Sequence, residues 1–328
     1  MSFFAVLFAL LVEQLKPLPR GAAVRDTVMS WMEWTGRNFD AGRERHAWVV
    51  WAITVLAPAA LAALVYIGLA RVSLVLALVW DVAVLYVTLG FRQFSHYFTD
   101  IRTALERGDE IEARRLLSQW RHLDTSELPR TELVRHVIEH SLLAAHRHVF
   151  GVFFWFVALS TFGLGPAGAV LYRMAEYAKR YWASRGRTVD AQVNERSQRL
   201  SAKLYVLLDH LPARMTAFGF AVVGNFEEAV TCWRRDAGLW AQPNEGIILA
   251  AAAGAVGVQL GGDAGAAVHP ERAKAMESTA LQTIVAEAAT PGLPPQVGHL
   301  RSVVGLVWRS VVLWMLLLAL LSLANLVG

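Results

Sequence analysis

Charged side chains are scarce in this sequence. Asp, Glu, Lys and Arg make up 18% of the 328 residues, whereas hydrophobic residues make up 55%. An average soluble domain carries roughly a quarter charged residues, so the composition argues against a soluble globular protein. The mean hydropathy of +0.38 points the same way. We therefore expect an integral membrane protein.

Cysteine and the common motifs of site chemistry are also missing. The single cysteine, Cys232, excludes an intramolecular disulfide and a cysteine-rich metal site. The sequence contains no P-loop, nucleophile elbow or kinase motif set. Its net charge is +4, but no nucleic-acid-binding motif accompanies it. We assign the basic excess to the loops of a membrane protein and expect no nucleic-acid partner.

Long apolar runs are what the sequence has instead. Segments 47–70, 72–91 and 303–327 each approach the roughly 20 residues that cross a hydrocarbon core of ~30 Å. Segment 2–15 is shorter. It lacks the basic start and the small-residue cleavage site of a signal peptide, so we interpret it as a membrane helix. Segment 149–172 is long enough to cross. Together these segments predict an all-α, polytopic membrane helical bundle that forms a single domain.

The last of these segments is interrupted by Gly163-Leu-Gly-Pro166, which predicts a broken helix. Nearly all Lys and Arg residues fall in 16–45, 92–147 and 173–302, which the positive-inside rule places in the cytoplasm. All three regions share one side only if segment 149–172 enters and returns as a re-entrant hairpin. If that segment crosses, region 173–302 lies outside. We expect amphipathic cytoplasmic helices over 92–147 and 173–302, in a multi-pass protein of the bacterial inner membrane.

Local patterns predict individual helices and a few polar positions. Residues 24–39 form an amphipathic, Trp-containing stretch that suits a helix at the membrane interface or one packed on the bundle. Gly108 and Asp109 are typical of a helix C-terminus followed by a new N-cap. His136 and His140 share a helical face. That spacing suits either a pair of zinc ligands or two polar positions that face solvent or a cavity.

Two acidic residues lie inside the predicted membrane helices. Glu13 is near the end of its segment and Asp81 is central in segment 72–91. A charge at bilayer depth costs a few kcal/mol on insertion scales and usually faces the bundle interior. Glu13 suits an interfacial position. We expect Asp81 to pair with a partner, to be protonated, or to face a water-filled cavity that carries substrate or protons.

A series of motifs in the second half of the chain occurs in a characteristic order. Leu211-Pro-Ala-Arg214 follows an apolar run, Asn244-x-Gly246 begins the next, and a run of small residues ends at Gly261-Gly262. With the preceding Gly165-Pro166 and Tyr172-Arg173, this order resembles the CobD/CbiB family. The resemblance implies a membrane protein that attaches the aminopropanol phosphate arm to adenosylcobyric acid in cobalamin synthesis. The AmpE-type membrane proteins, linked to β-lactamase regulation, belong to the same superfamily.

The chain departs from the family pattern at the acidic residues of that pattern. An E-N-x-x-D-G segment corresponds to residues 143–148, where both acids are lost: Leu143 takes the place of the glutamate and Arg147 that of the aspartate. A Y-R-x-x-N-T-L-D-S segment corresponds to residues 172–180, where Lys179 takes that place. An R-L-D-D segment corresponds to residues 203–206 and ends here in Tyr205-Val206.

These replacements change the expected chemistry of the site. An ATP-dependent ligation needs Mg²⁺, and Mg²⁺ needs hard oxygen ligands. Arginines instead favour bidentate binding of a carboxylate or phosphate, so we expect a polar cavity that faces the cytoplasm and holds an anionic ligand, with no metal. The predicted ligand-binding residues are Arg147, Arg173, Arg180, Arg214, Asp209, Asn244 and Glu245.

Three functions follow from this pattern. The first is a divergent, AmpE-like protein that binds an anionic small molecule or a protein partner and acts in envelope or signalling physiology. The alternative is an adenosylcobinamide-phosphate synthase that uses Mg-ATP and a corrinoid. The second alternative is a transporter, which a broken helix and Asp81 allow, although no inverted repeat is visible. The sequence leaves the oligomeric state open, a homo-oligomer included. Under the synthase alternative, the catalytic acids would come from Asp81, Asp209, Glu227, Glu228 or Glu245.

Overall fold

The computed structural model describes residues 2–15, 22–39, 44–121, 125–126, 128–185, 191–261 and 289–327. The regular elements over these residues are helices. Two isolated β-bridges, Val258 with Leu293 and Gly261 with Ala289, lie outside the helices. The predicted all-α class is confirmed. The chain divides into two compact units. Unit 1 comprises residues 1–92, 147–212 and 318–328, and unit 2 comprises residues 93–146 and 213–317.

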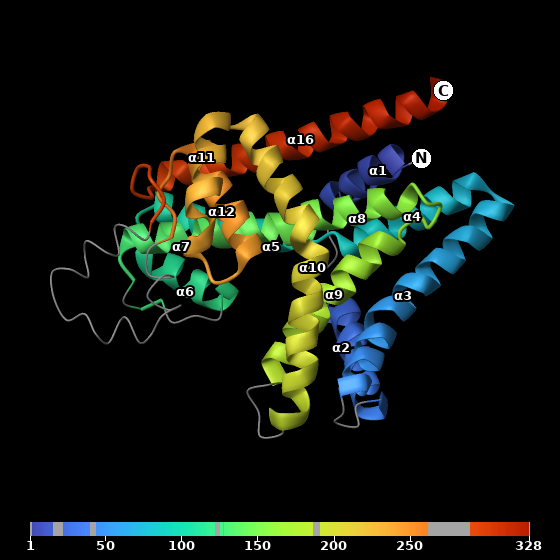
Figure 1. The fold of residues 1–328 in the computed structure, drawn as a ribbon. Coiled ribbons are helices and arrows are strands. Elements are labelled where there is room, and N and C mark those ends of the chain that lie inside the picture. Colours follow the sequence, from blue (N-terminus) through green and yellow to red (C-terminus); the bar gives the residue numbers. More distant parts are fainter. Residues whose placement is uncertain are drawn as a thin grey trace. The chain divides into compact units, whose positions relative to one another are not determined.

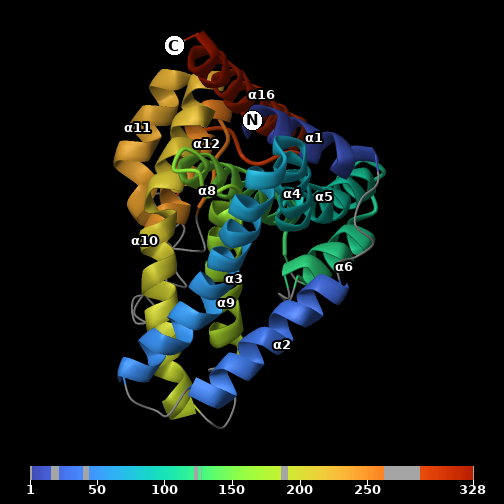
Figure 2. The ribbon, with the colours of Figure 1, turned by 90° about the vertical axis from the view of Figure 1, so that its right-hand side faces the viewer.

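Unit 1 is built around a helical hairpin and the helix that packs against it. The hairpin consists of α3 (Glu44–Val72) and α4 (Leu74–Thr88), and α9 (Ala167–Arg185) lies along α3 (Figure 2). Ser73 separates α3 from α4 because its Oγ accepts a 3.3 Å hydrogen bond from the backbone N–H of Val75, which caps the second helix. Helices α1 (Ser2–Leu15) and α2 (Ala22–Phe39) pack on α4 and α3 respectively.

The predicted break in the helix near Gly163 is confirmed. Helix α8 (Gly151–Ser160) ends before a turn over residues 161–166, and α9 follows. Gly163 and Gly165 have φ angles of 72° and 53°, a left-handed conformation that glycine adopts without steric cost. The ring of Tyr66 occupies the place of a side chain at Gly165. Beyond the turn, Gly168 has no room for a β-carbon against the backbone of Trp155, which lets α8 and α9 approach closely.

A five-residue π-helix, η1 (His146–Phe150), joins α7 (Arg130–Ala145) to α8. The boundary between the two units falls inside it, between His146 and Arg147. Short π-helical turns within α-helices are uncommon and are frequent at functional sites. This one contains the basic sequence His-Arg-His.

Unit 2 contains a second tight helical pair. Helices α11 (Phe226–Asp236) and α12 (Pro243–Val256) pack together (Figure 1). A β-carbon on Gly254 would overlap the backbone at Glu228, so the pair depends on that glycine. Asn225 caps α11 through its side chain. The α12 C-cap is Gly257, at φ 71°. A short η2 turn (Ala237–Leu239) joins the two helices.

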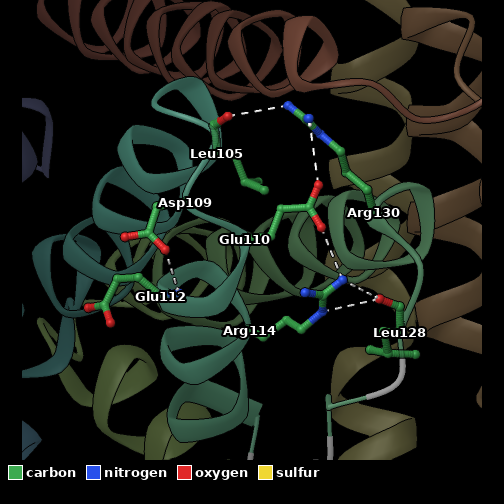
Figure 3. A network of polar contacts seen from close by, with 7 residues as sticks. All are labelled: Leu105, Asp109, Glu110, Glu112, Arg114, Leu128 and Arg130. Atoms are coloured by element: carbon green, nitrogen blue, oxygen red, sulfur yellow. Dashed lines mark hydrogen bonds and ion pairs between the residues drawn. The ribbon is translucent and has the colours of Figure 1, made fainter.

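The turn predicted at Gly108 and Asp109 is confirmed in unit 2. It separates α5 (Phe91–Glu106) from α6 (Glu110–Arg121), with Gly108 at φ 79° and Asp109 Oδ1 accepting a 3.0 Å hydrogen bond from Glu112 N–H. Figure 3 shows this cap beside a network in which Arg114 bonds both Glu110 and the carbonyl of Leu128. Arg114 thereby fixes the connection to α7.

Two long helices complete the chain: α10 (Ala191–Val223) and α16 (Val297–Val327). Four helical stretches of the described chain are long and apolar enough to cross a membrane, namely His46–Val72, Arg130–Ser160, Glu195–Val223 and Val297–Ala324. Two shorter apolar helices, Ser2–Glu13 and Leu74–Thr88, match predicted segments. The stretches Arg130–Ser160 and Glu195–Val223 reach into regions that the sequence placed among the cytoplasmic helices. The sidedness of those regions stays a prediction.

Candidate functional site

Helix α9 carries the polar face around which the candidate site of unit 1 is built. Tyr172, Arg173, Glu176, Lys179 and Arg180 recur at intervals of three and four residues, so they share one side of the helix. Arg173 is 5% exposed and Glu176 is 1% exposed. Charged residues are almost never buried this deeply unless they are paired, and these two are paired with each other.

Glu176 is bracketed by two arginines. It forms an ion pair with Arg173 one turn before it and a 2.5 Å ion pair with Arg180 one turn after it. Arg173 also donates a 3.0 Å hydrogen bond to the hydroxyl of Tyr177. Burial alone would raise the pKa of Glu176. The positive charges of Arg173 and Arg180 outweigh burial and lower that pKa to about 2. Glu176 is therefore ionised at every physiological pH.

Helix α10 supplies the second wall of the site. Tyr205 and Asp209 are four residues apart and both are 3% exposed. The Tyr172 hydroxyl donates a 2.7 Å hydrogen bond to Asp209 Oδ1 and lies 3.1 Å from the Tyr205 hydroxyl. The Lys179 ammonium stands 4.8 Å from the centre of the Tyr205 ring, a cation–π distance. Two consecutive helices thus meet through polar side chains that lie 33 and 37 residues apart in sequence.

The π-helix contributes the third side. A β-carbon at Gly90 would stand 2.6 Å from Nδ1 of His148, so that glycine leaves room for the imidazole. Arg147 is half-buried beside it. The positive charge of Arg147 also helps to lower the pKa of Glu176. We call the following residues the polar cluster: Arg147, His148, Tyr172, Arg173, Glu176, Lys179, Arg180, Tyr205 and Asp209.

The structure gathers part of the predicted ligand-binding set in this cluster. Arg147, Arg173, Arg180 and Asp209 all belong to it. The remaining predicted residues, Arg214, Asn244 and Glu245, belong to unit 2. Asn244 is buried in the first turn of α12 and Arg214 is half-buried on α10. Their part in ligand binding stays a prediction.

Sequence reasoning missed the partners of these residues. The predicted ligand-binding set omits Tyr172, Glu176, Lys179 and Tyr205. Part of the polar cluster could have been recognised from the sequence. Polar residues at spacings of three and four on two neighbouring helical segments indicate a polar face on each. No local pattern in the sequence indicates that the two faces meet.

The predicted histidine pair is engaged within unit 2. His136 Nδ1 lies 2.7 Å from a guanidinium nitrogen of Arg121, and the ring of His140 packs edge-on against Trp120 at 4.4 Å. On the same helix, Glu139 accepts a 2.9 Å hydrogen bond from the backbone N–H of Gly261, whose carbonyl Arg135 binds. These contacts hold α7 against the loop that follows α12. Within the described ranges, no group of three His, Cys, Asp or Glu side chains could hold a metal ion.

Both acidic residues predicted inside membrane helices are buried in unit 1. Glu13 is 6% exposed and Asp81 is 3% exposed. Asp81 Oδ1 has no hydrogen-bond partner among the described residues. Burial of this oxygen without such a partner is unfavourable for an ionised carboxylate. The pairing, protonation or cavity role of Asp81 stays a prediction.

Comparisons with known proteins cover most of the chain. A family model described as CobD/Cbib protein matches residues 2–291. A protein named cobalamin biosynthesis protein CobD, from Stutzerimonas stutzeri (strain A1501), is 31% identical over 325 residues, which is 96% of each chain. A protein of the same name from Chromobacterium violaceum is 37% identical over 213 residues, covering 64% of this chain and 63% of its own. No solved structure matches.

These relatives bear on the alternatives that the sequence left open. Their shared name refers to cobalamin biosynthesis, which agrees with the synthase alternative. Nothing in the comparisons supports the AmpE-like placement or a role in signalling. The comparisons therefore support the AmpE-like interpretation, which was drawn from the motif departures, less well than they support the synthase alternative.

Proposed function

The chain belongs to the CobD/CbiB family, and we propose that it is an adenosylcobinamide-phosphate synthase of cobalamin biosynthesis. The reaction joins the amine of aminopropanol phosphate to a carboxylate of adenosylcobyric acid as an amide, at the expense of ATP. We place the protein in the cytoplasmic membrane of a bacterium, with its large loops in the cytoplasm. The candidate membrane helices support the membrane assignment.

The observation that carries the proposal is the polar cluster itself. The departures at Arg147, Lys179 and Tyr205 argued against synthase chemistry because acids are replaced there. The cluster nevertheless holds two buried carboxylates, Glu176 and Asp209, in contact with basic and hydroxyl groups. Acidic groups are therefore present at the site, although at other positions of the sequence.

The charge of the cluster suits the proposed substrates. Its basic side chains, Arg147, Arg173, Lys179 and Arg180, outnumber the carboxylates of Glu176 and Asp209. A phosphate monoester carries nearly two negative charges at neutral pH and would offset the excess. Arg180 is the member best placed to meet a ligand from solvent, because its side chain is 51% exposed.

The proposed reaction also involves Mg-ATP. Mg²⁺ usually binds one or two protein carboxylates together with substrate phosphates and water rather than a cage made only of protein groups. The absence of a three-ligand group among the described residues is compatible with that mode. Asp209 and Glu176 are the carboxylates of the cluster that would contribute, and ATP would supply the remaining anionic ligands.

Complementation tests the proposal. We expect the gene for this chain to restore corrinoid production in a bacterium lacking its own adenosylcobinamide-phosphate synthase, with adenosylcobinamide phosphate identified by mass spectrometry. The membrane fraction should be probed in parallel to show that the protein is inserted. Continued accumulation of adenosylcobyric acid in cells that contain the inserted protein would refute the proposed activity.

A further inference from the structure

The exposed side chains of helix α10 change from charged to apolar along its length (Figure 1). In its first described turns the exposed residues include Glu195, Arg196, Arg199 and Lys203. Beyond Lys203, exposed apolar residues recur every three or four positions, so they share one side of the helix. We call them the apolar stripe, and each is between 37% and 71% exposed: Leu207, Leu211, Met215, Phe218 and Val222.

The length of the apolar stripe is close to a membrane dimension. Leu207 and Val222 are fifteen residues apart, roughly 22 Å at a rise of 1.5 Å per residue, and the hydrocarbon core of a bilayer is ~30 Å thick. A contiguous row of large exposed apolar side chains is uncommon on a soluble protein and indicates a surface that something apolar covers.

The backbone of α10 indicates what covers it. Pro212 lies inside the helix and lacks the N–H that would bond the carbonyl of Leu208, four residues earlier. Trp155 of α8 supplies the missing donor, because its Nε1–H donates a 3.1 Å hydrogen bond to that carbonyl. In hydrocarbon, the protein itself must satisfy every backbone polar group, and a neighbouring helix can do so at a proline. A carbonyl that faces water needs no such donor.

Within unit 2, the apolar stripe adjoins a second apolar helix. Helix α16 is a candidate membrane span with a mean hydropathy of 2.2. Its Trp314 comes close to α10 at Gly219, where Nε1 lies 3.4 Å from the place of a β-carbon. The side chains of Val312 and Leu316 on α16 are themselves 64% and 56% exposed. Two adjoining helices that both expose apolar side chains are expected where both contact lipid.

We propose that the apolar stripe of α10 contacts the acyl chains of the membrane, and that Lys203 marks the level of the phospholipid headgroups. A lysine at this boundary lays its methylene stem along apolar surface and keeps its ammonium group among the headgroups. Between Leu207 and Val222, a stretch described without gaps, His210 is the exposed polar residue, and it is not without a partner. The proposal does not depend on the synthase activity.

The proposal also sets the depth of the polar cluster. Tyr205 and Asp209 are buried on α10, two and six residues beyond Lys203. Along the helix axis these positions lie roughly 3 and 9 Å from Lys203. The polar cluster then lies at the boundary between headgroups and hydrocarbon. A water-soluble anionic ligand reaches it from the headgroup layer.

Spin labels on α10 test the proposal. Cys232 is the only cysteine of the sequence, so Cys232→Ala provides a background for single cysteines at Leu211, Phe218 and Val222. Arg199→Cys, on the charged part of the same helix, is the matched control. The full-length protein is reconstituted in phosphatidylcholine vesicles. Power-saturation electron paramagnetic resonance then measures the accessibility of each label to oxygen, which concentrates in hydrocarbon, and to nickel ethylenediaminediacetate, which stays in water.

We expect the three stripe labels to be accessible mainly to oxygen and the Arg199→Cys label mainly to the nickel complex. The three stripe positions are independent, so the readout survives if one variant fails to insert. Stripe labels that are open to the nickel complex would place this face in water and overturn the proposal. Labels that neither reagent reaches would mean that protein, such as a second copy of the chain, covers the stripe instead of lipid. An oxygen-accessible Arg199→Cys label would refute the headgroup level at Lys203.

Discussion

The hydroxyl of Tyr172 donates a 2.7 Å hydrogen bond to Asp209 across 37 residues of sequence. Both side chains are buried, at 0% and 3% exposure. Gly151 makes this contact possible, because a β-carbon there would overlap the Tyr172 ring. The tyrosine therefore fixes the position of the buried carboxylate.

Tyr172→Phe should destabilise unit 1. The substitution removes a hydrogen bond to a buried carboxylate, which contributes about 1.5–3 kcal/mol. We expect the free energy of unfolding in detergent to fall by about 2 kcal/mol, measured by denaturant titration. Tyr97→Phe is the control, since its ring stacks on Trp120 and that stacking is retained. Equal effects of the two substitutions would mean that the bond to Asp209 carries no stability.

Glu176→Gln should destabilise the protein in a pH-dependent way. The folded-state pKa of Glu176 is lowered to about 2 from the ordinary value of 4.5. A lowered pKa contributes stability that is present above about pH 4.5 and is lost as the pH falls toward 2. The free energy of unfolding of the variant should therefore be lower by about 3 kcal/mol at pH 7, a value typical of a broken buried ion pair.

Denaturant titrations of both proteins between pH 7 and pH 3 check this. The difference in free energy of unfolding between wild type and Glu176→Gln should become smaller as the pH decreases. Glu195→Gln is a suitable control, because Glu195 pairs with Arg199 in an exposed i,i+4 arrangement and should contribute no more than about 0.5 kcal/mol. A difference that does not change with pH would rule out the ion pairs as its source.

Gly168→Ala should disrupt the close approach of α8 and α9. A β-carbon there meets the Trp155 carbonyl and cannot be accommodated without backbone movement. We therefore expect the free energy of unfolding to fall by about 1–3 kcal/mol, or the variant to fail to accumulate in the membrane. Gly68→Ala on α3 is the matched control because nothing lies within 4 Å of the added carbon. That variant should be neutral or more stable by up to about 1 kcal/mol. Similar losses at both positions would contradict the packing argument.

Cys232 should react slowly with alkylating reagents in the folded protein. Burial, with a smaller contribution from the neighbouring Asp236, raises its pKa to about 11 from the ordinary 9.0, and the side chain is 1% exposed. The reactive thiolate is therefore scarce below pH 9. N-ethylmaleimide labelling at pH 8, followed by intact mass, should be much faster in denaturant than in mild detergent. Comparable rates would show that the thiol is accessible in the folded state.

Much of the fold was determined by the sequence itself. Apolar runs near 47–70 and 303–327, the break at Gly163–Pro166, and the turn at Gly108 and Asp109 each depend on residues close together in the chain. Helix period, glycine conformation and capping are local properties, so these features were predictable. The motif order that relates the chain to the CobD/CbiB family could also be identified from the sequence alone.

Only the tertiary structure decided which polar residues meet. Arg147, Lys179 and Tyr205 appeared in the sequence as three separate losses of acid. The packing of η1, α9 and α10 makes them one site, with Glu176 and Asp209 a helical turn away. Such pairings depend on the rotation and register of these helices relative to one another. Side-chain packing over whole helix faces sets those quantities, and no local pattern specifies them.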